Sequence, residues 1–124
     1  MNLVDSSAWL EYFADGKNAK YFANVIENTD ELIVSSINIY EVFKKILSEK
    51  DENTAIQIVG LMQQAEVINV SRKIALNAAR LSIQYKLPMA DSIIYSTALL
   101  HNAILWTQDS DFKNLDSVKY YLKN

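Results

Sequence analysis

The sequence predicts an α/β fold, a three-layer sandwich in which a parallel sheet of about four to five strands is flanked by helices. Short apolar runs alternate along the chain with longer stretches whose apolar residues recur at helical spacing. Strands that are separated by helices form parallel sheets with helices on both faces, joined by right-handed crossovers. The pattern does not reveal the order of the strands.

The length and composition fit one domain over residues 1–124, half of which are apolar. The absence of cysteine excludes disulfides and thiolate metal sites, and the scarcity of glycine excludes a glycine-rich phosphate loop. No apolar run is long enough to span a membrane, and no basic segment followed by an apolar stretch opens the chain. We therefore expect a soluble, cytoplasmic protein with no membrane partner.

The first strand is predicted at residues 2–5, a short apolar run closed by an acid. Residues 6–16 follow as an amphipathic helix. Ser6 or Ser7 is the expected helix cap, and Gly16 is the expected stop.

The middle of the chain continues the alternation. Residues 19–28 predict a short amphipathic helix, and "ELIVSS" at 31–36 predicts a buried second strand. Apolar residues at helical spacing predict helices at 37–50 and 53–65. The run "EVINV" at 66–70 predicts the third strand.

The chain after residue 70 contains two more predicted helices and the remaining strands. A helix over 71–86 is expected to be capped by Ser71, and one over 88–102 opens with proline. The apolar run at 103–107 predicts the fourth strand, and 118–122 is a candidate for a fifth.

Four acidic residues fall at positions that this fold brings together. Asp5 closes the first strand, and Asp109 lies just past the fourth. Glu41 and Asp91 are expected in the first turns of the helices that follow the second strand and precede the fourth. Because strand carboxyl ends and helix amino ends share one edge of a parallel sheet, we expect all four side chains at the edge where such sheets bind ligands.

Four neighbouring carboxylates repel one another unless some are protonated or a cation joins them. Ligand sets made only of oxygen select magnesium or manganese over zinc. Such a pocket suits phosphodiester hydrolysis, in which a water held by the metal is the nucleophile and no covalent intermediate is needed. His101, the single histidine, is interpreted as a partner of a helix dipole rather than a ligand.

Each acid also has a purely structural interpretation. Asn38 and Glu41 have the spacing of a capping box, and Asp91 suits the first turn of a helix. Asp5 fits an ordinary turn or cap, and "DSD" at 109–111 fits an Asx-turn. The demand that all four acids share one edge favours the functional interpretation.

The sequence gives weaker evidence for a nucleic-acid-binding surface than for the acidic site. The net charge of −3 is not typical of a nucleic-acid-binding protein. The aromatic run "WLEYF" at 9–13 has helical spacing and is interpreted as core rather than as a base-stacking surface. The basic residues on the predicted helices are interpreted as solvated faces, some of which could line the mouth of the pocket: Lys44, Lys45, Arg72, Lys73, Arg80 and Lys86.

These motifs resemble those of the PIN-domain family, and within it the VapC-type toxins of toxin–antitoxin pairs. "LVDSSAWLEYF" resembles the family's first motif and "SSINIYEVF" its second. "MADSIIYSTALLHNAILWTQDSDF" resembles the third and fourth. The resemblance runs from Asp5 to Phe112 and is most specific in this last segment, while residues 50–85 carry little identifying pattern.

The resemblance implies a metal-dependent endoribonuclease, the toxin of a type II pair of the VapBC kind. The residues at the family's acidic positions, implied to be catalytic and to bind Mg²⁺ or Mn²⁺, are Asp5, Glu41, Asp91 and Asp109. The implied auxiliary residues are Asp111, Thr107, whose hydroxyl would orient the site, and Ser6. The implied partners are an RNA substrate, a small cognate antitoxin and a second copy of the chain in a homodimer.

Two other functional classes stay open. A receiver-like signalling domain also binds magnesium with aspartates at a sheet edge, but it needs paired acids after the first strand, where this chain has Asp5 alone. A non-catalytic PIN-like binding module is the other class, and the intact set of acids argues against it. The sequence identifies neither the RNA nor the number of metal ions.

Overall fold

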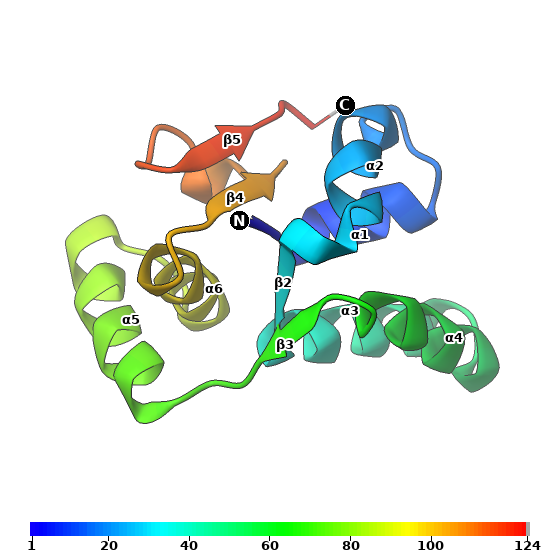
Figure 1. Cartoon of the computed structure of the whole chain (residues 1–124), viewed down its shortest axis with the longest axis horizontal. Coiled ribbons are helices and arrows are strands. Elements are labelled where there is room, and N and C mark those ends of the chain that lie inside the picture. The colour runs from blue at the N-terminus through cyan, green and yellow to red at the C-terminus, as the bar shows by residue number, and fades with distance from the viewer. Residues whose placement is uncertain (124) are drawn as a thin grey trace.

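Five parallel strands form the central sheet of the computed structural model, which describes residues 1–123 (Figure 1). The strands are β1 (Asn2–Val4), β2 (Leu32–Ser35), β3 (Glu66–Ile68), β4 (Ile104–Thr107) and β5 (Val118–Tyr120). Their order is β3-β2-β1-β4-β5, and every pairing is parallel. The predicted fold class is confirmed, the candidate fifth strand is present, and the order puts β1 at the centre.

Helices connect the strands and cover the sheet. They are α1 (Ser6–Phe13), α2 (Ala19–Glu27), α3 (Ser36–Glu49), α4 (Glu52–Met62), α5 (Arg72–Tyr85) and α6 (Met89–Leu100). Two 3₁₀ turns, η1 (Thr29–Glu31) and η2 (Ser110–Phe112), precede β2 and follow β4. Within the part of the chain that the structure describes, no helix has the length and apolarity needed to cross a membrane.

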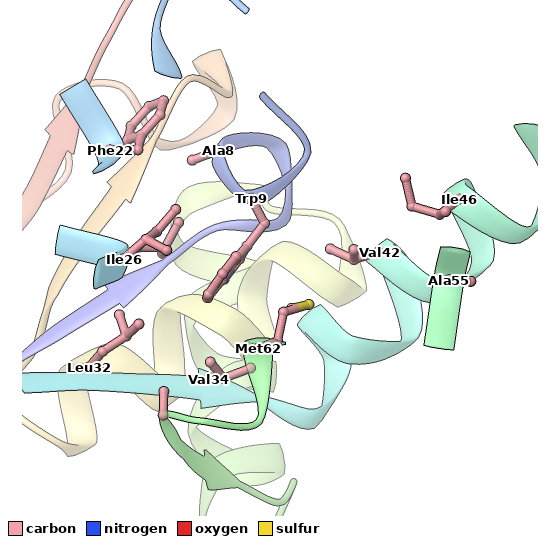
Figure 2. Packing of buried hydrophobic residues seen from close by; sticks show 12 residues of the cluster. Ala8, Trp9, Phe22, Ile26, Leu32, Val34, Val42, Ile46, Ala55 and Met62 are labelled. Atoms are coloured by element: carbon pink, nitrogen blue, oxygen red, sulfur yellow. The ribbon is translucent and has the colours of Figure 1, made fainter. Parts of the chain in front are cut away.

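The core consists of two hydrophobic clusters, because successive strand residues point to opposite faces of the sheet. On β1, Val4 belongs to the cluster under α1–α4, whereas its neighbour Leu3 belongs to the cluster under α5 and α6. Figure 2 shows the first cluster, in which Trp9 reaches from α1 toward Ile26 and Met62. With only 2% of its surface exposed, Trp9 is a core residue, as the helical spacing predicts.

Helix α1 begins and ends differently from the prediction. Its N-cap is Asp5, and neither Ser6 nor Ser7 caps it, because both lie inside the first turn. The Ser7 hydroxyl donates instead to the Asp5 carboxylate at 2.7 Å. The helix ends at Phe13, before Gly16, and the residue that takes the left-handed conformation (φ 52°) is Asp15.

Helix α3 is capped one turn earlier than predicted, and Glu41 is not in its first turn. The hydroxyl of Ser35 accepts from Ile37 N at 3.2 Å, and the Asn38 side chain accepts from Ser35 N at 3.1 Å. This capping box leaves Glu41 in the second turn, so the interpretation of Glu41 as a capping residue is wrong. The predicted cap of α5 is confirmed, since Ser71 Oγ accepts from the third residue of that helix.

Replacing Asn38 with alanine should destabilise the protein. The Asn38 side chain is fully buried and also donates to Ser6 Oγ at 2.9 Å, so alanine leaves the buried Ser35 N–H without a partner. An unpaired buried donor costs ~1–3 kcal/mol, and we expect the free energy of unfolding in urea to fall by about 2 kcal/mol. The control is Asn24→Ala at an exposed position of α2, where a change within ~0.5 kcal/mol is expected. Equal losses in the two variants would contradict the assigned role.

Candidate active site

The acids predicted for the site meet at the carboxyl edge of the central strands. Asp5 directly follows β1, and its backbone N–H donates to Trp106 O on the neighbouring β4 at 2.9 Å. Asp109 follows β4 after one intervening residue, and Glu41 lies on α3, the helix that follows β2. Asp91 lies in the first turn of α6, as predicted. Three adjacent strands and the antiparallel return of α6 therefore deliver these side chains to one region.

Asp5 is buried and is held by hydroxyl groups. Its side chain is almost fully excluded from solvent, with 3% of the residue exposed. Its Oδ2 accepts from Ser7 Oγ at 2.7 Å and from Thr107 Oγ1 at 2.9 Å. Thr107 Oγ1 in turn accepts from Asp109 N at 2.9 Å. The last residue of β4 thus fixes the Asp5 carboxylate and the start of the Asp109 turn together.

Glu41 is held by a second chain of hydrogen bonds. Its Oε1 accepts from Ser6 Oγ at 2.7 Å, and Ser6 Oγ accepts from Asn38 Nδ2 at 2.9 Å. Ser6 therefore contacts Glu41 on α3 rather than the adjacent Asp5. This chain joins α1 to α3, so the two helices fix the position of Glu41 relative to Asp5.

Three carboxylates come close enough to share one cation. Oxygen atoms of Asp91, Asp109 and Asp111 all lie within 4.8 Å of one another. Asp109 Oδ1 also accepts from Asp111 N at 2.9 Å, so the predicted Asx-turn is present and it brings the two side chains together. Within residues 1–123, Asp5 and Glu41 do not belong to this close group. The sequence predicts these two residues as metal ligands and Asp111 only as an auxiliary residue.

The surroundings of Asp5 and Asp91 favour their protonated forms. Burial raises the pKa of Asp5 to about 6 against the opposing hydrogen bonds from Ser7 and Thr107, and the charges of Asp109 and Glu41 raise it further. Burial also raises the pKa of Asp91 to about 8, together with its hydrogen bond to Asp111 and the charges of the neighbouring aspartates. These carboxyl groups therefore lie close enough to oppose one another's ionisation.

This donor set fits a hard divalent cation. All donors are carboxylate oxygens, which suit magnesium and manganese. Without a cation, the repulsion is relieved by protonation, which is the state that the raised pKa values of Asp5 and Asp91 describe. A cation bound among them would favour the ionised forms instead.

Sequence reasoning missed two residues that support the site. Ser7, rather than Ser6, donates to Asp5, and the hydroxyl repeat in "DSS" is a signal that could have indicated it. Gln108 is 4% exposed, and its Nε2 and backbone N–H lie 3.4 Å from Ser7 O and Oγ. Its Oε1 accepts from Asn18 Nδ2 at 2.9 Å, a contact across 90 positions that no sequence pattern signals.

We expect the metal-free protein to lose stability as pH rises from about 4 to about 8. Between the unfolded pKa of 3.8 and the folded values of about 6 for Asp5 and about 8 for Asp91, the folded state binds more protons than the unfolded state. The two groups therefore contribute stability that is complete below pH ~4 and is lost as pH rises through the folded values. In the Asp91→Asn variant the amide side chain at this position cannot ionise, so stability should fall less steeply as pH rises.

The measurement is the melting temperature in EDTA at several pH values. Asp30→Asn, a change at an exposed acid in η1, is the matched control and should keep the wild-type decline. A decline of equal size in Asp91→Asn would contradict the contribution assigned to Asp91.

Comparison with known proteins places this geometry in a family. The family model described as PIN domain matches residues 3–118. No curated protein matches the sequence significantly. Among solved structures, the chain is similar to a toxin–antitoxin complex from Klebsiella pneumoniae, at 26% identity and a TM-score of 0.81 over 96% of each chain.

Two further solved structures share the fold at lower identity. VapC20 from Mycobacterium tuberculosis, described as a sarcin–ricin loop cleaving toxin, is 13% identical over 94% of this chain and 95% of its own, with a TM-score of 0.77. FitAcB from Neisseria gonorrhoeae is 18% identical over 90% and 89%, with a TM-score of 0.73. The match to the family model over nearly the whole chain, with the same fold in toxins of toxin–antitoxin complexes, shows that the chain belongs to the PIN-domain family.

Proposed function

We propose that this protein is a metal-dependent endoribonuclease and the toxin of a VapBC-like toxin–antitoxin pair. The observation that carries the proposal is the group of three carboxylates within 4.8 Å beside the buried Asp5. Membership of the PIN-domain family supports a nuclease. The description of the Mycobacterium tuberculosis relative as a toxin that cleaves the sarcin–ricin loop supports RNA as the substrate.

The carboxylates would hold Mg²⁺ or Mn²⁺. Asp91, Asp109 and Asp111 would bind the cation, and Asp5 and Glu41 would add negative charge and further oxygen donors beside it. When bound, the metal would supply the positive charge that activates a water and stabilises the leaving oxygen of the phosphodiester.

The remaining residues would position these acids. The hydroxyls of Ser7 and Thr107 hold the Asp5 carboxylate, and the latter also fixes Asp109 through its backbone. Ser6 holds Glu41 through a separate hydrogen bond. Because these donors stabilise carboxylates in fixed orientations, the acids would be arranged before the cation arrives, which lowers the cost of ordering them on binding.

The proposed partners follow from the relatives. Proteins of this fold are described in complexes with antitoxins and in VapBC assemblies, which supports a small cognate antitoxin for this chain. We further propose that the chain forms a homodimer. A basic side chain of the antitoxin that enters the acidic site would neutralise the carboxylates in place of the metal and thereby inhibit cleavage.

The alternatives are weaker. Membership of the PIN-domain family excludes the alternative that the chain is a receiver-like signalling domain. A non-catalytic binding module of the same fold has no need to hold five carboxyl groups in one region against their mutual repulsion, at Asp5, Glu41, Asp91, Asp109 and Asp111.

We expect RNA cleavage to require Mg²⁺ or Mn²⁺, to stop with EDTA, and to be abolished by Asp91→Asn. The amide matches the shape of a neutral carboxyl, which is the form that the raised pKa of Asp91 favours without metal, so the fold should persist. The amide lacks the charge that a divalent cation requires, so metal binding should fall. The measurements are cleavage of labelled RNA and calorimetric titration with Mn²⁺.

The matched control for this experiment is again Asp30→Asn at an exposed acid outside the site, which should cleave at the wild-type rate. Cleavage by Asp91→Asn at an undiminished rate would refute the assignment of Asp91 to the metal site.

Expression of the wild-type chain alone should arrest bacterial growth, and Asp91→Asn should relieve the arrest at equal soluble expression. Co-expression of the cognate antitoxin should restore growth to cells that carry the wild-type chain. The measurement is growth after induction, with the amount of soluble protein quantified in parallel. Unimpaired growth with abundant soluble wild-type protein would count against a toxin, while cleavage in vitro would decide the nuclease separately.

A further inference from the structure

A surface pocket opens on α3 directly beside the acidic site. It has a volume of about 260 Å³ and is lined by Tyr40, Glu41, Lys44, Lys45 and Ser48. Glu41 links it to the site, because the same carboxylate accepts the hydrogen bond from Ser6 and raises the pKa of Asp5. A ligand in this pocket would therefore lie next to the carboxylates.

The pocket combines an exposed ring with a positive charge. Tyr40 is 60% exposed although it is aromatic. Lys44 Nζ lies 5.6 Å from the centre of the Tyr40 ring and 3.5 Å from its hydroxyl. Lys45 is paired with Glu49 at 2.8 Å, whereas Lys44 has no acidic partner among the described residues. The pocket thus offers one ring face and one uncompensated cation.

A second pocket opens on the other side of the site, beside Asp109. It has a volume of about 460 Å³, and its lining includes Ser7, Gln108, Asp109, Tyr120 and Lys123. It repeats the combination of an aromatic ring, a lysine and a carboxylate of the site.

A larger groove, with a volume of about 720 Å³, adjoins both pockets. It shares Ser7, Gln108 and Lys123 with the pocket beside Asp109, and it shares Lys45 with the pocket on α3. A flexible chain that lies in this groove could therefore contact both pockets, each of which contains one carboxylate of the site, Glu41 or Asp109.

We infer that these pockets hold a single-stranded RNA on both sides of the phosphate that is cleaved. Tyr40 stacks on a base, and Lys44 and Lys123 bind backbone phosphates. Single strands are bound by aromatic platforms combined with cations along the backbone, which is the chemistry that both pockets present. The inference rests on the proposed nuclease function, and it explains how a chain of net charge −3 attracts RNA through local cations.

The pair formed by Lys20 and Tyr21 on α2 is a matched control. Lys20 Nζ lies 5.2 Å from the centre of the Tyr21 ring, so it repeats the contact of Lys44 with Tyr40. Both residues are exposed, and neither lines either pocket or the adjoining groove. Lys20→Gln therefore removes the same charge from a similar surface, at a position outside the two pockets and the groove that together form the proposed RNA-binding track.

The test measures the affinity of a fluorescein-labelled single-stranded RNA octamer by anisotropy in EDTA, where cleavage is stopped. Tyr40→Ala should weaken binding about tenfold, and Tyr40→Phe, which keeps the ring, should restore it. Lys44→Gln and Lys123→Gln should each lower the slope of log K against log salt by about 0.7, the value for one phosphate contact to a single strand. Lys20→Gln should change neither quantity.

The outcomes separate this inference from the proposed function. Wild-type affinity in Tyr40→Ala and in Lys44→Gln, or equal losses in Lys44→Gln and Lys20→Gln, would overturn the track even if the protein cleaves RNA. Binding that depends on these residues in a protein that cleaves no RNA would overturn the nuclease and leave the track. If these variants lose affinity for the antitoxin and none for RNA, the groove is a protein interface and the inference fails.

Discussion

Repulsion among carboxyl groups at the edge of the sheet is the constraint on which the rest of the site depends. Parallel strands with β1 and β4 side by side bring Asp5 and Asp109 to one edge, and α6 returns Asp91 to the same place. Burial makes the ionisation of Asp5 and of Asp91 more costly, and it raises the pKa of both groups. A cation bound at this site would displace protons from these groups, so the proposed metal binding would be linked to pH and to the stability of the fold.

Hydroxyl and amide groups at the ends of helices and strands hold these neighbouring carboxyl groups in place through hydrogen bonds. Thr107 joins Asp5 to Asp109, and the chain from Asn38 through Ser6 joins the cap of α3 to Glu41. The same residues thus cap a helix, end a strand and orient acids. We expect a substitution among them to change both the stability of the fold and the affinity of the proposed metal site, whereas a change at an exposed acid outside the site, such as Asp30, should change neither.

The surface on both sides of the acids carries positive charge and aromatic rings. A lysine and a tyrosine flank the carboxylates on each of two sides: Lys44 and the exposed Tyr40 on α3, and Lys123 after β5 and the partly buried Tyr120 at its end. An acidic chain can attract RNA in this way because charge acts locally, within about a Debye length of ~8–10 Å at physiological salt. The net charge of −3 alone therefore does not exclude RNA as a substrate of this protein.

The sequence by itself determined the α/β class, the extents of most elements and the positions of the acids after strands and in helices, because these depend on local apolar spacing and on residues near in the chain. Tertiary structure alone decided the strand order, the choice of Ser35 over Asn38 as the cap of α3, and the closeness of Asp111 to Asp91. It also decided that Asn18 supports Gln108. These contacts join distant segments, and their geometry is set by how helices pack on the sheet, which no local pattern encodes.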